Sequence, residues 1–182
     1  AKKALEAGNY SEAVSLLAEC LEYPHHLGEG KLHGAQENDF YYFMGCAYEG
    51  LGQNDKAVEC WEQAIVGPTE PAAAMYYNDA KPDKIFYQGL ALLKLNRMDE
   101  ANGRFHKLTT YGEKYLFDKV KMDYFAVSLP DLLIWEDDLT IRNVIHCKYM
   151  MALGYWGLNE KEKSVRLLSE VERLDINHQG IQ

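Results

Sequence analysis

The sequence predicts an all-α protein made of repeated helical hairpins, and two observations support this prediction. Four segments of similar sequence recur along the 182 residues. On both sides of the centre of each segment, apolar residues lie three or four positions apart, as on one face of a helix. Each centre is a turn residue followed five positions later by a small residue. The turn residues are Gly8, Gly52, Asn96 and Asn159, and the small residues are Ala13, Ala57, Ala101 and Ser164.

The spacing of these segments indicates one structural unit that is repeated. Gly8 and Gly52 are 44 residues apart, Gly52 and Asn96 are again 44 apart, and Asn159 follows after 63. Glycine and asparagine adopt the left-handed backbone conformation that closes a helix at its carboxyl end. We therefore expect a helix, a tight turn and a second helix in each unit, over the approximate ranges 1–24, 39–66, 83–109 and 139–175.

The second unit indicates how the two helices of a pair pack. Tyr41, Gly45 and Tyr48 share one face of its first helix, and Ala57, Trp61 and Ala64 share one face of its second helix. Small residues let two helices approach closely, while large neighbours fill the space beside the contact. We expect Gly45 to face Ala57, with Tyr48 and Trp61 beside them.

This pattern resembles the tetratricopeptide repeat family, in which an aromatic residue, Leu-Gly, Tyr, Ala, a second aromatic residue and Ala follow one another. The second unit matches with Tyr41, Met44-Gly45, Tyr48, Ala57, Trp61 and Ala64, and the third with Gly89, Leu92, Ala101, Phe105 and Leu108. The fourth keeps Tyr155, with Ala152, Ser164, Leu168 and Val171 as small or apolar substitutes. The resemblance implies hairpins that form a right-handed superhelix, an α-solenoid, whose first helices line a concave groove.

The linkers between the units are longer than this family requires. The period of 44 residues exceeds the usual ~34 by about ten, and the excess lies in "PHHLGEGKLHGAQEND" and "GPTEPAAAMYYNDAKPD". Together with "IFYQGLALLKL" and "DYFAVSLPDLLIWEDDL", these linkers resemble the helical-repeat region of large bacterial proteins that also carry an uncharacterised galactose-mutarotase-like domain. That resemblance implies a bacterial multidomain protein from a carbohydrate-related setting. The chain also begins inside an expected helix, which predicts a piece of a longer chain whose exposed end repeats associate with other molecules.

An aromatic-rich insertion near 111–138 interrupts the repeats and is expected to form short helices. Within it, "SLPD" resembles a capping box in which Ser128 is the N-cap, Pro130 lies in the first turn and Asp131 reaches back. Asp137 or Asp138 is expected to cap the long helix that follows. Acidic residues gather here, but no spacing singles out a catalytic pair, and we expect them to be solvated at helix amino ends. They are Asp123, Asp131, Glu136, Asp137 and Asp138.

Composition argues against several classes of partner. With 19 basic and 28 acidic residues the net charge is −9, which is the wrong sign for nucleic acid or an anionic membrane. The sequence has no apolar run of about 18 residues, as a membrane-spanning helix requires. Four cysteines without a C-x-x-C pair lie among apolar neighbours, which predicts buried free thiols and a cytoplasmic location. They are Cys20, Cys46, Cys60 and Cys147.

No metal site or other cofactor is predicted. The histidines lack the H-x-x-x-H spacing and other ligand patterns, so structural or exposed roles are favoured. They are His25, His26, His33, His106, His146 and His178. The glycine-rich "GEGKLHG" lacks the phosphate-loop pattern.

A second stripe on each first helix supplies the candidate binding residues. An aromatic residue leads it each time, and a polar residue precedes that aromatic. In the second unit the stripe is Asp39, Tyr42, Cys46 and Glu49; in the third it is Asp83, Phe86, Leu90 and Leu93; in the fourth it is His146, Tyr149, Leu153 and Trp156. In the resembling family these positions face the groove, and aromatic rings give large contact area at low entropy cost. The alternative is that long linkers cover these rings as part of the core.

Two functional hypotheses follow. The first is a non-catalytic interaction or scaffold module that docks a peptide segment, or a neighbouring domain of the same polypeptide, on its concave face. The second is an accessory carbohydrate-binding region of a bacterial glycan-processing enzyme, with sugars stacked on Tyr42, Phe86, Tyr149 and Trp156. We do not expect this chain to be an enzyme, and fold alone does not decide its function.

Overall fold

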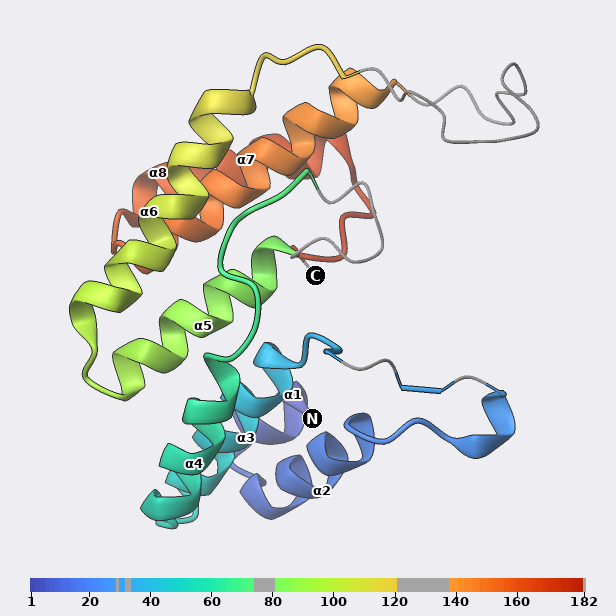
Figure 1. Cartoon of the computed structure of the whole chain (residues 1–182), viewed down its shortest axis with the longest axis vertical. Coiled ribbons are helices and arrows are strands. Elements are labelled where there is room, and N and C mark those ends of the chain that lie inside the picture. The colour runs from blue at the N-terminus through green and yellow to red at the C-terminus, as the bar shows by residue number, and fades with distance from the viewer. Residues whose placement is uncertain (29, 32–33, 74–80, 121–137, 182) are drawn as a thin grey trace.

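The computed structural model describes residues 1–28, 30–31, 34–73, 81–120 and 138–181 and is all-α in these ranges (Figure 1). Its helices are α1 (Lys2–Glu6), α2 (Tyr10–Cys20), α3 (Asn38–Gly50), α4 (Asn54–Ala64), α5 (Pro82–Lys94), α6 (Met98–Tyr115), α7 (Leu139–Gly157) and α8 (Lys161–Leu174), with a short 3₁₀ helix at His25–Leu27. The prediction of helical hairpins is confirmed, since consecutive helices pack as pairs.

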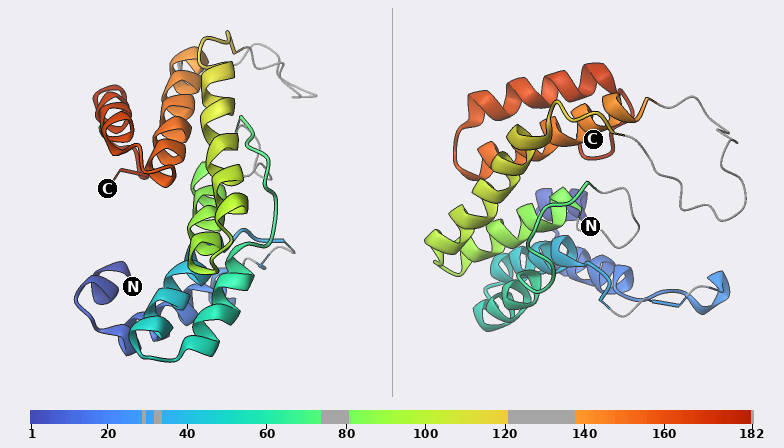
Figure 2. Two further views of the ribbon diagram at one scale, coloured as in Figure 1. Left: turned by 90° about the vertical axis from the view of Figure 1, so that its left-hand side faces the viewer. Right: turned by 45° about the horizontal axis from the view of Figure 1, so that its top comes forward.

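The pairs also pack against one another in a regular way. The second helix of each pair contacts the first helix of the next, as α4 contacts α5 and α6 contacts α7. The first helices contact each other in turn, α3 with α5 and α5 with α7. In the left view of Figure 2 the pairs follow a curved path, and both ends of the chain lie on its inner side. First helices therefore form a continuous row.

Each pair is closed by the same turn, as the sequence predicted. Gly8, Gly52, Asn96 and Asn159 all have positive φ, between 59° and 76°. In every turn the N–H of the next residue donates to the carbonyl five positions earlier, for example Gln53 to Tyr48 at 2.9 Å and Glu160 to Tyr155 at 2.8 Å. This is the Schellman arrangement, which satisfies the carbonyls at the end of a helix.

Close contact within a pair is built on glycine. A Cβ added to Gly45 would lie 2.6 Å from Cδ1 of Trp61, so this indole is the nearest side chain to Gly45. The predicted contact of Gly45 with Ala57 stays a prediction. A Cβ added to Gly89 would lie 2.6 Å from Cζ of Phe105. The large ring occupies the notch that glycine leaves, and both members of the second contact lie 44 residues after those of the first.

The other predicted packing residues are also inside. Ala57, Ala64, Ala101 and Phe105 are buried, and Tyr48 is half-buried beside Trp61. In the last pair Ser164 takes the buried alanine position and its hydroxyl donates to the carbonyl of Ala152 at 2.7 Å. The small residues after each turn therefore lie at helix contacts.

The region predicted as an insertion begins later than expected. Helix α6 continues to Tyr115, because its apolar face keeps contact with α7. The predicted capping box at Ser128, Pro130 and Asp131 lies outside the described residues. The predicted cap of α7 is confirmed at Asp138, whose carboxylate accepts from the N–H groups of Thr140 and Ile141 at 2.8 and 3.3 Å.

The thiols differ from the prediction at three positions. All four cysteines are free and Cys147 is buried, but Cys46 and Cys60 are half-buried and Cys20, at the end of α2, is exposed. Its helix is covered on one face only, and Cys20 lies on the open face.

Among the helices of the described ranges, none is both long and apolar enough to cross a membrane.

Candidate functional site

On α3 the predicted stripe lies against α5. Lys84 of α5 forms an ion pair with Asp39, and Lys94 forms one with Glu49. Between these ion pairs, the rings of Tyr42 and Tyr87 lie 5.5 Å apart. The stripe of the second unit is therefore an interface between neighbouring first helices.

Burial sets the chemistry of this interface. Burial is the largest cause that raises the pKa of the Tyr42 hydroxyl, and the neighbouring Cys46 raises it further. Burial also raises the pKa of the Cys46 thiol, although Lys94 opposes this shift. Both groups are consequently neutral near pH 7, and Cys46 is not poised as a thiolate nucleophile.

On α5 the stripe divides between core and surface. Phe86 is only 8% exposed and packs with Phe105 and Met150 in a core cluster to which Leu90 and Leu93 also contribute. Asp83, in the first turn of α5, keeps a third of its side chain exposed. Asp83 lies 4.0 Å from Lys84, whose closer partner is Asp39.

On α7 the stripe runs from the linker to an open rim. The Nε2 atom of His146 lies 2.8 Å from the carbonyl of Ala72, which attaches the linker to α7. Tyr149 is 8% exposed, Leu153 is half-buried and Trp156 is 45% exposed. A large exposed indole next to buried rings distinguishes this helix from α3 and α5.

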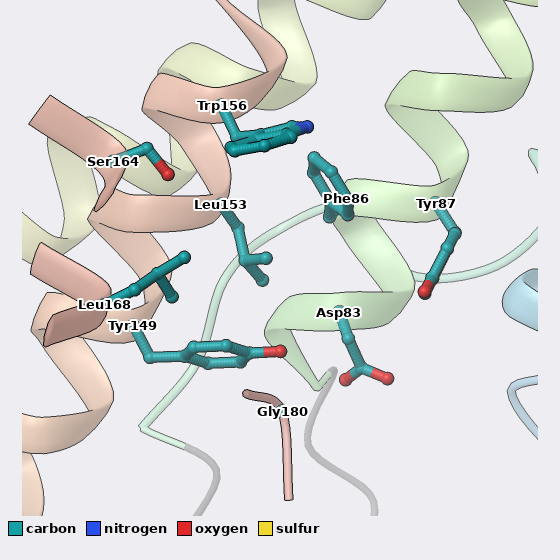
Figure 3. A pocket seen from close by; sticks show the side chains of 9 residues that line it. All are labelled: Asp83, Phe86, Tyr87, Tyr149, Leu153, Trp156, Ser164, Leu168 and Gly180. Atoms are coloured by element: carbon teal, nitrogen blue, oxygen red, sulfur yellow. The ribbon is translucent and has the colours of Figure 1, made fainter. Parts of the chain in front are cut away.

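Five residues of the predicted stripe meet in one pocket of about 230 Å³ between α5, α7 and α8 (Figure 3). Figure 3 shows the indole of Trp156 and the ring of Tyr149 at opposite ends, Leu153 between them, and Phe86 and Asp83 on the side of α5. The full lining is Asp83, Phe86, Tyr87, Tyr149, Leu153, Trp156, Ser164, Leu168 and Gly180. The pocket is mainly aromatic and aliphatic, with a carboxylate at one side.

The segment after α8 forms one wall of this pocket. The ring of His178 lies 4.6 Å from that of Tyr149, and a Cβ added to Gly180 would lie 2.7 Å from Cε2 of Tyr149. Burial, followed by the nearby charge of Asp83, raises the pKa of the Tyr149 hydroxyl. Tyr149 is thus a neutral hydroxyl group held between the segment and α5.

Sequence reasoning missed four residues of the lining: Tyr87, Ser164, Leu168 and Gly180. Tyr87 had a detectable signal, because it lies 44 residues after Phe43, another aromatic residue that follows the stripe, and the two rings lie 5.1 Å apart. Burial, then Asp39 and Asp83, raise the pKa of Tyr87 to about 12. Gly180 had no signal, because its position depends on how the chain turns after α8.

The arrangement offers binding contacts and gives little support to catalysis. In the described part of the chain no three His, Cys, Asp or Glu side chains are grouped to hold a metal ion. Of the acidic residues considered as a catalytic pair, Asp138 caps α7, and Asp123, Asp131, Glu136 and Asp137 lie outside the described residues. The pocket itself is lined by a single carboxylate, that of Asp83.

Comparison with known proteins identifies one repeat. Residues 39–65, which span α3 and α4, match the tetratricopeptide repeat family. No solved structure matches the chain. The match does not bear on the resemblance to regions associated with a galactose-mutarotase-like domain, which stays a prediction. Tetratricopeptide repeats are in general protein-binding and typically non-catalytic. Residues 39–65 of this chain are such a tetratricopeptide repeat.

Proposed function

We propose that this chain is a non-catalytic interaction module, an α-solenoid of right-handed twist, that docks a peptide segment or a neighbouring domain of its own polypeptide on its inner face. The observation that carries the proposal is the pocket between α5, α7 and α8, where Trp156 is 45% exposed beside the buried rings of Phe86 and Tyr149. On α3 the same stripe is in contact with α5 and does not line this pocket.

The pocket has features that suit a peptide side chain. Its size of about 230 Å³ admits one large side chain, and its aromatic walls supply contact area without many rotatable bonds. Aromatic residues that are already fixed by packing lose little entropy on binding. Tyr149 is held by His178 and Phe86 by Phe105, so this surface is largely pre-organised.

The test is selection of binding peptides from a random display library, followed by measurement of their Kd with Trp156→Ala. Truncating an interface tryptophan commonly costs 2 kcal/mol or more, about a 30-fold loss of affinity. The matched control is Phe117→Ala, because Phe117 is 87% exposed and lies outside the pocket. Equal binding by wild type and Trp156→Ala would place the peptide elsewhere and refute the proposal.

A glycan array run with the same two variants tests the carbohydrate alternative. The exposed indole of Trp156 and the Asp83 carboxylate line the same pocket and favour that alternative, because sugars stack on such rings and hydrogen-bond to such acids. Sugar binding that Trp156→Ala abolishes, with no peptide selected, would replace the peptide proposal.

A further inference from the structure

Between α3 and α5, lysine side chains form ion pairs with two acidic residues of the stripe. Lys84 pairs with Asp39 while its ammonium group lies 5.3 Å from the ring centroid of Phe40. Lys94 pairs with Glu49 and lies 5.2 Å from the ring of Trp61. In both cases a lysine from the next first helix contacts a carboxylate and an aromatic ring together, which combines ion pairing with cation–π attraction.

These contacts follow one register. Each lysine lies 45 residues after the acid that it contacts, which is the repeat period plus one. Asp83 is the equivalent of Asp39, 44 residues later. Because the next pair follows after 63 residues, the position equivalent to Lys84 in α7 is Cys147, which is buried and cannot supply a cation.

The carboxylate of Asp83 therefore has no lysine at the register position that serves Asp39. Asp39 and Asp83 share Lys84, which contacts Asp39 and lies 4.0 Å from Asp83, so the three groups carry a net charge of −1. Aromatic rings adjoin this carboxylate in the pocket, namely Phe86, Tyr87 and Tyr149, with Trp156 at the rim (Figure 3). The ammonium group of Lys161 lies 5.9 Å from the Trp156 ring, so a lysine already reaches this rim.

We propose that the pocket binds a lysine side chain of the docked peptide, with its alkyl chain along Phe86 and Leu153 and its ammonium group at Asp83. This inference rests on the proposed function and names the residue that the peptide presents. The carboxylate and rings would then hold a ligand lysine as Asp39 and Phe40 hold Lys84.

The experiment titrates the ¹⁵N-labelled full chain with three heptapeptides, acetyl-Gly-Ser-Leu-Xaa-Leu-Ser-Gly-amide, in which Xaa is lysine, norleucine or glutamate. Norleucine keeps the alkyl chain and removes the charge. We expect the lysine peptide to shift the indole N–H signal of Trp156 and to bind about five- to tenfold more tightly than the norleucine peptide. The glutamate peptide should bind most weakly.

Asp83→Asn should abolish the preference for the lysine peptide over the norleucine peptide. The matched control is Asp99→Asn, since Asp99 is an exposed acid in the first turn of α6. Salt provides a second measurement that needs no variant. Raising the NaCl concentration should weaken binding of the lysine peptide and leave binding of the norleucine peptide unaffected.

The outcomes separate this inference from the proposed function. Equal binding of the lysine and norleucine peptides, or an unaltered lysine preference in Asp83→Asn, would overturn the lysine assignment. The proposal that the pocket binds a peptide would still stand. Absence of binding by the lysine peptide also overturns the lysine assignment. If the display library yields no peptide that depends on Trp156, the proposed function fails as well.

Discussion

Replacing Gly89 by alanine should destabilise the protein, because the space for a side chain is already occupied. The added Cβ would lie 2.6 Å from Cζ and 3.0 Å from Cδ1 of Phe105, whereas ordinary contact begins at 3.4 Å. Phe105 is fully buried, so its ring has little room to move. Overpacking of this kind costs about 1–3 kcal/mol, and the gain in helix propensity from glycine to alanine offsets about 1 kcal/mol of it.

The expected net loss is up to about 2 kcal/mol, which lowers Tm by up to about 8 °C in a chain of this size. Thermal unfolding followed by circular dichroism measures it. Gly103→Ala is the matched control, because Gly103 lies in α6 and a Cβ there would meet nothing within 4 Å; this variant should gain up to about 1 kcal/mol. If Gly89→Ala gains stability as Gly103→Ala does, the ring-in-notch packing is refuted.

Three further predictions concern other parts of the fold. Asn38→Ala should cost about 1–3 kcal/mol in urea unfolding, because the Asn38 amide donates to two backbone carbonyls at 2.8 Å; Asn54→Ala, at an exposed position, should cost far less. With a disulfide reagent at pH 8, Cys20 should react rapidly and Cys147 only on unfolding, because burial raises the pKa of the Cys147 thiol to about 11; modification of Cys147 in the folded protein, located by peptide mapping, would contradict this. The pKa of Tyr87 is raised from 10 to about 12, so its contribution to stability is complete below pH 10 and lost as pH rises through 12; Tyr87→Phe should flatten that part of the alkaline fall in Tm.

The hairpins could be predicted because their signals are local. The turn residue, the small residue five positions later and the glycine notch all lie within one pair of helices, so periodicity detects them. The residue nearest to Gly45 could not be predicted for a geometric reason: spacing shows that two faces meet, but not which residue on the second face fills the notch. Trp61 fills it because a ring, and not a methyl group, has the volume.

The candidate site depended on contacts between pairs, which spacing within one helix does not reveal. Asp39, Tyr42 and Glu49 face α5 because of partners 45 residues away. A search for opposite charges at the repeat period plus one would have found both lysines. The pocket beside α7 also needs the turn of the chain after α8, which brings Gly180 to Tyr149, and no sequence pattern marks that return.

The contrast between Asp39 and Asp83 explains why the protein tolerates a carboxylate whose ion pair with Lys84 is as long as 4.0 Å. Both acids lie in the first turn of a helix, where the backbone N–H groups and helix dipole stabilise a negative charge by about 0.3–1 kcal/mol. The side chain of Asp39 is 17% exposed and that of Asp83 is 33% exposed, so solvent also screens Asp83. The fold therefore requires Lys84 at Asp39 more than it requires any cation at Asp83. Removing the Asp83 charge should consequently change what the pocket binds while the helices that form it keep their packing.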